Sequence, residues 1–573
     1  MGEVGRLPVA LRGDGRRWST VPAERSVLGV VHNITSATRL LDLLSVFEND
    51  ERVQVFFSCT GSSALDEGTG AFLTAHGMLH LPWSEAVSRS FDIAVATSRG
   101  GDLDRLRCPV VFAPHGAGYN KRLGREGGAF GLTDEWLVHE GRLIPAALAL
   151  SHTEQLDRLA EGCPRALPIA QVVGDPVLDQ LSAGRAFRAV YREALGLLPG
   201  QRLVVVSSTW GHGSVLGSPR TGILRRALAE LPADEFRVLA AVHPNAWYGH
   251  GAWQIRTWLA SLVDAGLVLP APETEVWKAA LCAADFLIGD HGSLTLYGVA
   301  LGVPCLLGAF RDPVVAPGSP MRRLRGLVPG ITGTRPLSAQ LAHAADTQRD
   351  DGELAALRRS VTSEPGKSAA LVRRLLYSRL SLPEPPYPAA TRAVPVPSVP
   401  SPRAGRLPHL PATLVSTAVN QGGRDPEISL RRFPAALQQA PHDHLAAAHL
   451  TADPDDPDRR WPRSAEVLLL PHTRYPYPDA VRWSDFAARF PGCALIAVEE
   501  TGHGCTVLLG DDTRLRAHWA DRPAWASFDA AASAVHAWTR ASPAEIRTQD
   551  ALRLGIHAGE GLPPALVDVV PLR

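Results

Sequence analysis

Short apolar runs in this sequence end in polar residues whose types could support chemistry. The residues that follow these runs are His32-Asn33, Pro114-His115-Gly116, Gly174-Asp175-Pro176, Thr209-Trp210-Gly211, His243-Pro244-Asn245 and Asp290-His291-Gly292-Ser293. If the runs are parallel strands, their carboxyl ends share one edge of a sheet, and ligands of open α/β sheets bind at that edge. Several of the ends carry a histidine, so we expect them to line a polar cleft.

His115 is the strongest candidate for a catalytic base. An imidazole can take a proton from a substrate hydroxyl near neutral pH. In the segment FAPHGAGYNK, Gly116 would let the backbone approach a ligand closely, and Lys121 adds a positive charge. The alternative is a histidine that only stabilises its own loop through backbone hydrogen bonds.

The segments around His243 and around Asp290 suit the binding of a phosphate. His243 precedes a proline that fixes the local turn, and it could donate a hydrogen bond to a phosphate or simply stabilise that turn. Asp290, His291, Gly292 and Ser293 mark a junction from strand to helix, where Ser293 is a plausible N-cap. Free amides at a helix start, together with the helix dipole, attract anions. Simple N-capping would explain Ser293 but not its neighbours.

Two other features carry weaker signals. The loop GHGSVLG (211–217) follows a strand and could cradle a pyrophosphate, but it matches neither the dinucleotide fingerprint nor the P-loop. His442-Asp443-His444 has two histidines near one another, an arrangement more typical of solvated loop residues than of metal ligands. We therefore expect no metal site and no cofactor.

The elements that must position these residues form two successive blocks. Runs such as VQVFF (53–57) and RLVVVSS (202–208) are apolar without alternation, and helical stretches separate them. This pattern is typical of parallel strands covered on both faces. The sequence predicts an α/β fold with two tandem Rossmann-like domains, 1–185 and 186–382, that face a central cleft.

The rest of the chain is predicted to be a linker and an accessory domain. Residues 383–411 contain ten prolines, which favour an extended, semi-rigid linker that contributes to no core. Residues 412–573 contain strand candidates at 465–471, 493–500 and 505–511, mixed with helical stretches. They predict a small C-terminal α/β or α+β domain without an assigned task.

Composition excludes several classes of protein. The 58 basic and 58 acidic residues cancel, so no global attraction to nucleic acid is expected. Seven scattered cysteines without a CxxC pair predict neither a disulfide framework nor a zinc ribbon. No segment approaches the roughly 20 apolar residues of a membrane span, and the N-terminus lacks the apolar stretch of a signal peptide. We expect a cytoplasmic protein.

Taken together, the motifs resemble the GT-B glycosyltransferase superfamily, especially its CDP-glycerol glycerophosphotransferase (teichoic-acid polymerase-like) branch. The segment PHGAGYNK (114–121) is similar to the HG loop of that branch, Thr209-Trp210 to its TW motif, and His243-Pro244 to its HP motif. The order of the branch's motifs is completed by Asp290 and Ser293 before an apolar helix and by Gly302-Val303-Pro304 after it. VVGDPVLD (172–179) is also similar to a segment of UDP-N-acetylglucosamine 2-epimerases. The resemblance covers roughly residues 25–380.

This resemblance implies a transferase that moves a sugar or polyol-phosphate unit from a CDP- or UDP-linked donor to a hydroxyl acceptor. His115 in the acceptor domain would be the base. Thr209, Trp210, Gly211, His243, Asp290, His291, Gly292 and Ser293 in the donor domain would bind the nucleotide and its phosphates. Further cleft candidates are His32, Asn33, Gly116 and Lys121.

The sequence departs from the family pattern in ways that keep alternatives open. His291-Gly292 replace the middle of the family's aspartate-serine loop, and Gly211-His212 stand where a basic residue often follows the TW motif. A UDP-N-acetylhexosamine 2-epimerase-like enzyme would use the same cleft, but it requires carboxylates near the sugar. A non-catalytic module that binds a nucleotide or a partner is the other alternative.

Overall fold

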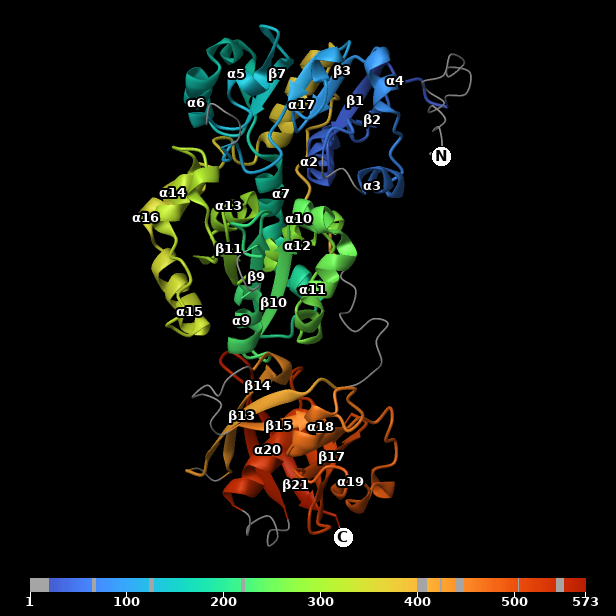
Figure 1. The fold of residues 1–573 in the computed structure, drawn as a ribbon, viewed down its shortest axis with the longest axis vertical. Coiled ribbons are helices and arrows are strands. Elements are labelled where there is room, and N and C mark those ends of the chain that lie inside the picture. Colours follow the sequence, from blue (N-terminus) through green and yellow to red (C-terminus); the bar gives the residue numbers. More distant parts are fainter. Residues whose placement is uncertain are drawn as a thin grey trace.

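Three folded units follow one another along the molecule (Figure 1). The computed structural model describes residues 20–63, 68–122, 128–217, 222–398, 410–422, 425–438, 448–502, 504–542 and 551–572. The His442-Asp443-His444 segment and the N-terminal segment considered for a signal peptide (1–19) lie outside these residues. The first unit is at the top of Figure 1, the second in the middle, and a barrel at the bottom.

The first domain is built on a parallel sheet with the strand order β2-β1-β3-β4-β7-β8. Its strands are β1 (Arg25–Val31), β2 (Val53–Cys59), β3 (Ile93–Ala96), β4 (Val110–Phe112), β7 (Pro145–Leu150) and β8 (Ala170–Val172). Its helices are α2 (Ile34–Leu44), α3 (Thr69–Ala75), α4 (Trp83–Ser88), α5 (Asp134–Leu137) and α6 (Glu154–Gly162). The neighbours Val27 and Leu28 belong to different apolar clusters, one on each face. Such two-sided burial explains why these strands read as continuous apolar runs.

The second domain repeats this arrangement with the parallel strand order β10-β9-β11-β12. Its strands are β9 (Arg202–Ser208), β10 (Phe236–Val242), β11 (Phe286–Gly289) and β12 (Cys305–Leu307). Its helices are α8 (Arg188–Ala194), α9 (Gly222–Glu230), α10 (Pro244–His250), α11 (Ala252–Asp264), α12 (Val276–Ala283), α13 (Ser293–Ala300), α14 (Pro320–Leu327), α15 (Leu337–Gln348) and α16 (Gly352–Arg359). Val204 and Val205 again pack on opposite faces. Both parallel α/β domains predicted from the sequence are present.

Two helices cross between the domains. Helix α7 (Pro176–Gly184) leads from the first domain to the second, and α17 (Ser368–Leu380) returns. Val372, Leu375 and Leu376 of α17 are buried in the core of the first domain. The predicted limits assign these residues to the second domain, because sequence order alone does not reveal a returning helix.

The proline-rich segment packs against both domains over the residues that the structure describes. Arg392 forms an ion pair with Glu48 of the first domain (2.5 Å). The Tyr191 hydroxyl of the second domain donates to the Val394 carbonyl (2.5 Å). Val394 is only 6% exposed and joins the core of the second domain, contrary to the expectation that this segment contributes to no core. An extended segment can still lay one side chain into a groove.

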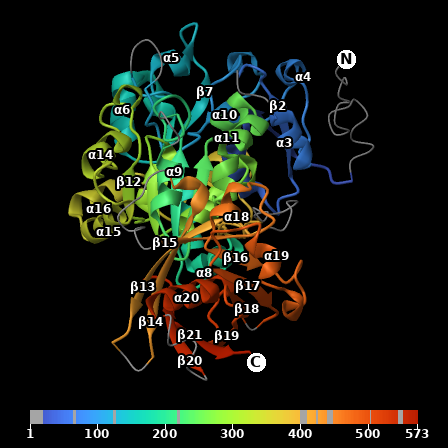
Figure 2. The same cartoon turned by 60° about the horizontal axis from the view of Figure 1, so that its bottom comes forward.

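The C-terminal domain is a closed barrel with strand order β13-β14-β20-β21-β19-β18-β17-β16-β15. The strands are β13 (Thr413–Asn420), β14 (Glu427–Pro434), β15 (Ala448–Ala452), β16 (Val467–Leu470), β17 (Leu495–Glu500), β18 (Gly504–Leu509), β19 (Arg514–Asp521), β20 (Leu552–His557) and β21 (Ala565–Pro571). Helix α20 (Phe528–Ala541) packs against many of them and shares their apolar core (Figure 2). The predicted mixture of helices and strands is present, but closure of the strands into a barrel was not predicted.

Two further expectations can be compared with the described residues. All seven cysteines lie within them and all are free, in agreement with the absence of a disulfide framework. Among the helices that the structure describes, none has the length and apolar character needed to span a membrane.

Candidate active site

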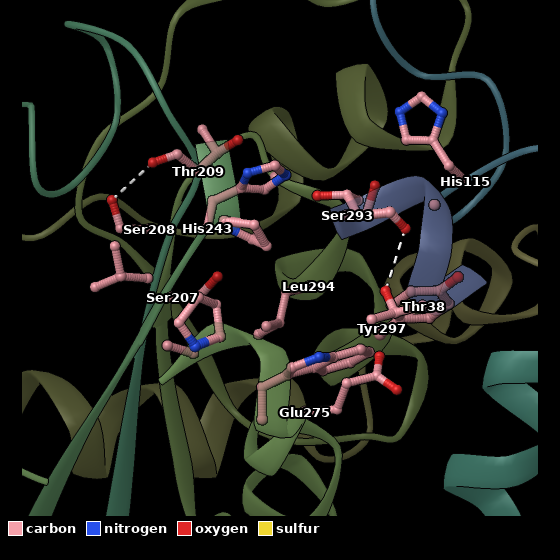
Figure 3. A pocket seen from close by; sticks show the side chains of 18 of the residues that line it. Thr38, His115, Ser207, Ser208, Thr209, His243, Glu275, Ser293, Leu294 and Tyr297 are labelled. Carbon is pink, nitrogen blue, oxygen red and sulfur yellow. Dashed lines mark hydrogen bonds between the residues drawn. The ribbon is translucent and has the colours of Figure 1, made fainter. Parts of the chain in front are cut away.

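A cavity lies between the two α/β domains, at the carboxyl ends of their strands (Figure 3). Helix α2 and the loop after β4 contribute its first-domain wall, and the ends of β9 and β10 with the starts of α12 and α13 contribute the other. Seven of the residues singled out from the sequence line it: His115, Gly116, Lys121, Thr209, His243, Gly292 and Ser293. The parallel strands therefore bring these distant residues together.

His243 is held in an orientation suited to donating a hydrogen bond. It is the N-cap of α10, and the backbone N–H of Asn245 donates to its Nδ1 (3.0 Å). Burial, with Lys121 and His115 nearby, lowers the pKa of His243 well below its usual value. In the neutral ring the remaining proton must therefore be on Nε2. His243 can therefore stabilise its turn through Nδ1 and still donate a hydrogen bond to a phosphate through Nε2.

The start of α13 approaches the first domain closely. A Cβ added to Gly116 would lie 2.4 Å from the Ser293 Oγ, so only glycine fits there without displacing Ser293. The N-cap is Gly292 rather than Ser293, which corrects the expectation from the sequence. Ser293 is instead the first helical residue and lines the cavity. The first amides of a helix have no intrahelical partner, so this end presents donors and a positive dipole to the cavity.

His115 has the tautomer that a general base requires. Its Nδ1 lies 2.9 Å from the Thr97 carbonyl oxygen, which can only accept, so Nδ1 carries the proton. The lone pair is then on Nε2. Burial and the charge of Lys121 lower the pKa of His115 to about 4, so the ring is neutral at pH 7. The backbone contact weighed in the sequence analysis is present, and it orients the ring.

Lys121 is a half-buried cation in the lining of the cavity. No described residue forms an ion pair with it, and its Nζ lies 4.9 Å from the centre of the Trp210 ring. Burial lowers the pKa of Lys121 to about 8, although Asp290 opposes this shift. A desolvated, unpaired cation is costly, and a bound anion would remove that cost.

Asp290 lies beneath the cavity rather than in its lining. Its carboxylate accepts hydrogen bonds from the backbone amides of Thr209 (2.8 Å), Val215 (3.1 Å) and Gly292 (2.9 Å). Burial raises the pKa of Asp290 to about 6. The carboxylate therefore ties the loop after β9 to the loop before α13, and direct contact with a phosphate is not supported.

The remaining candidates are divided between the second cavity and the surrounding structure. His291 lines a second cavity beside the first, whereas Trp210 and Gly211 line neither. Asn33 is the N-cap of α2 in a capping box. His32 packs against the loop after β3, where a Cβ on Gly100 would lie 1.8 Å from its ring. Both residues shape the edge of the sheet, and neither lines the two cavities.

Sequence reasoning missed part of the lining. Thr35, Thr38 and Arg39 of α2 face the first cavity, as do Glu275, Trp277 and Tyr297 of the second domain. The Arg39 guanidinium is paired with Asp42 (2.9 Å) and with Glu275 across the domain boundary. The spacing of Thr35, Thr38 and Arg39 on one helical face was a usable signal. Across the described residues, no group of three or more His, Cys, Asp or Glu side chains could hold a metal.

Parts of the chain are similar to known proteins. No family model matches the sequence. Over 183 residues the chain is 32% identical to a UDP-N-acetylglucosamine--N-acetylmuramyl-(pentapeptide) pyrophosphoryl-undecaprenol N-acetylglucosamine transferase of Ralstonia nicotianae. That match takes in 31% of this chain and 46% of the relative, so the chain spans about half the length of the curated relative it matches.

Solved structures with a similar arrangement include the wall teichoic acid polymerase TagF, with a TM-score of 0.45, 12% identity, and coverage of 63% of this chain and 90% of that one. A putative UDP-N-acetylglucosamine 2-epimerase from Listeria monocytogenes has a TM-score of 0.40, 15% identity, and coverage of 63% and 99%.

Proposed function

We propose that this protein is a transferase of the GT-B kind that moves a sugar or polyol-phosphate unit from a nucleoside-diphosphate-linked donor to a hydroxyl acceptor. One observation carries the proposal. A neutral histidine with an Nε2 lone pair, the His243 Nε2–H donor, the Lys121 cation and the start of α13 line the same cavity between two parallel sheets. A base and an anion site facing each other suit group transfer from a phosphate leaving group.

On the donor side, the diphosphate would bind His243, Lys121 and the start of α13. His243 offers Nε2–H, Lys121 offers a charge, and the helix offers backbone amides. These groups are fixed by the fold before the ligand arrives. They would stabilise the negative charge that grows on the departing nucleotide, which is where binding energy increases rate.

On the acceptor side, His115 would remove the proton of the attacking hydroxyl. The acceptor oxygen forms a bond to the transferred unit, the bond from that unit to the nucleotide breaks, and the electron pair leaves with the nucleotide. The proton goes to His115 Nε2. A bound diphosphate would raise the low pKa of His115 through its negative charge and so strengthen the base during turnover.

The lining of the first cavity favours transfer over the epimerase-like alternative. Glu275 is the single carboxylate among the residues that line it. Its oxygens are already engaged by Arg39 and by Lys278, whose Nζ lies 2.9 Å away. An enzyme that needs carboxylates near the sugar would find none free in this lining.

A thermal-shift panel with CMP, CDP, UMP, UDP and GDP tests the proposal, because a ligand that binds only the folded state raises the melting temperature. We expect stabilisation by cytidine or uridine nucleotides that His243→Ala reduces. His250→Ala, at the far end of the same helix, is the matched control. A preference for cytidine would point to a CDP-linked donor, and a preference for uridine to a UDP-linked donor. No shift with any nucleotide would refute the proposal.

A further inference from the structure

The second cavity lies directly beside the first and shares His115, Gly116, Lys121 and Ser293 with it. His115 therefore stands between two cavities, one on the side of the donor domain and one largely within the first domain. The transfer proposed above requires a second ligand whose hydroxyl reaches both His115 and the donor. The second cavity is in the position where the second ligand would bind.

The charges that line the second cavity are all positive. Arg99 and Lys121 line it, and no aspartate or glutamate does. Neither cation forms an ion pair with a carboxylate among the described residues. Arg99 follows β3, and its Nη1 donates to the Glu135 carbonyl oxygen (2.8 Å), which leaves further guanidinium N–H groups. Arg99 is half-buried, and burial lowers its pKa although the charges of Asp104 and Glu135 oppose this shift.

An aromatic wall accompanies these cations. The rings of Phe130 and Trp136 pack edge to face with centroids 4.3 Å apart, and Phe130 lies 6.2 Å from the His115 ring. The Arg99 guanidinium lies 5.9 Å from the centre of the Trp136 ring. Aromatic faces of this kind accept flat apolar surfaces, including the face of a sugar ring. The wall thus lies between Arg99 and the base.

A buried polar group without a partner marks the same cavity. His291 lines it and is 8% exposed, and its Nδ1 is buried without a hydrogen-bond partner among the described residues. Buried polar atoms are rarely left unpaired in native proteins unless a ligand or a water satisfies them. Together with Arg99 and Lys121, His291 makes this cavity rich in unused polar groups.

We propose that the second cavity is an acceptor site for a hydroxyl compound that carries an anionic group, a phosphate or a carboxylate. Arg99 binds the anionic group, Trp136 and Phe130 contact the face of the acceptor, and its hydroxyl points toward His115. The assignment as an acceptor site rests on the proposed function. The anion site itself rests only on the lining of the cavity.

Titration calorimetry of the full chain with three probes tests this site. The probes are glucose 1-phosphate, glucuronate and the neutral methyl glucoside, which share a sugar ring and differ in charge. We expect at least one anionic probe to bind and the neutral probe not to bind. Arg99→Gln should weaken binding at least tenfold, and Arg99→Lys should retain part of it, because lysine keeps the charge but not the planar fork. Arg105→Gln, an exposed arginine of the same domain, is the control.

The results separate this inference from the proposed function. Equal binding of charged and neutral probes, no binding of any probe, or binding unaffected by Arg99→Gln would overturn the inference. The nucleotide panel is run on the same variants, and their melting temperatures without ligand report folding. Probe binding without nucleotide binding would refute the proposed function but leave the anion site. Nucleotide binding without probe binding would refute the anion site but leave the proposed function.

Discussion

Two half-buried cations of this protein differ in their partners, Lys121 in the cleft and Arg432 at the joint between the second domain and the barrel. Arg432 forms ion pairs with Asp234 and with Asp529, both at 2.5 Å, and these partners hold its pKa above the usual value. Among the described residues Lys121 has no such partner, and burial lowers its pKa. One cation is satisfied by the fold, whereas the other is not.

The difference separates a structural site from a site that awaits a ligand. At the joint, the Ala233 amide also donates to the Arg432 carbonyl (2.9 Å), so the barrel is fixed to the end of the second domain that faces away from the cleft (Figure 1). In the cleft, no carboxylate of the described residues forms an ion pair with His115, His243 or Lys121. Changes at the joint should therefore cost stability, and changes in the cleft should cost activity.

The largest effect is expected for His115→Ala in the cleft. Loss of a general base should lower kcat about 10²–10⁴-fold, measured as nucleotide release in the presence of an acceptor. Nucleotide binding should persist, because His243 and α13 are unchanged. His80→Ala, an exposed histidine of the same domain, should retain full activity. Retained turnover in His115→Ala would contradict the assignment of the base.

The next effect is expected at the joint. Arg432→Met leaves Asp234 and Asp529 buried without their counter-ion and should lower the free energy of unfolding by about 3–5 kcal/mol, measured by urea denaturation. Combining it with Asp234→Asn and Asp529→Asn should restore much of the loss. Arg553→Met breaks an exposed pair with Asp568 and should cost about 0–1 kcal/mol. Similar losses of unfolding free energy in Arg432→Met and Arg553→Met would contradict the view that the ion pairs at the joint hold the structure together.

A change at Asp290 should affect both stability and ligand binding, because this carboxylate lies beneath the cleft and holds its loops in place. In Asp290→Asn the amide NH₂ would face backbone N–H donors, and the loss should be about 1–3 kcal/mol of unfolding free energy. Nucleotide affinity should fall as well, since the loops that carry Thr209 and Gly292 lose their common anchor. The exposed Asp102→Asn is the control. A loss of stability without any loss of affinity would show that the loops keep their positions.

The smallest effect is a dependence of ligand binding on pH. The pKa of Lys121 is about 8 when no ligand is bound, so the fraction that is charged falls as pH rises from 7 to 9. An anion binds the charged form better, so affinity for a nucleoside diphosphate should fall by up to about tenfold by pH 9. Calorimetry at pH 7, 8 and 9 measures this fall. Lys121→Arg stays charged and should bind the nucleoside diphosphate equally at all three pH values. A wild-type affinity that is constant with pH would exclude Lys121 from the site.

Local patterns were enough to predict the parallel domains and several residues of the first cavity. The apolar strands place His115 and His243 each at the carboxyl edge of its own parallel sheet, and both residues line the cavity between the two sheets. Arg99 was missed because a single arginine carries little information in a chain whose 58 basic residues are nearly all arginine. The inward turn of Asp290 depends on three backbone amides that no motif specifies.

The barrel shows why the rest could not be predicted. Its individual strands at Val467–Leu470, Leu495–Glu500 and Gly504–Leu509 coincide with predicted runs. Closure depends on β14 pairing with β20, for example Ile428 with Ile556, which are distant in sequence. Such a non-local contact leaves no periodic signal in either segment.

The most direct measurement is titration calorimetry of the full chain with inorganic pyrophosphate, which probes the anion site of the cleft without the nucleobase. The account predicts one binding site per chain, with affinity reduced at least tenfold in His243→Ala and unchanged in His250→Ala. Absence of pyrophosphate binding, or equal affinity in the two variants, would contradict the claim that the unpaired groups of the cleft form a phosphate site.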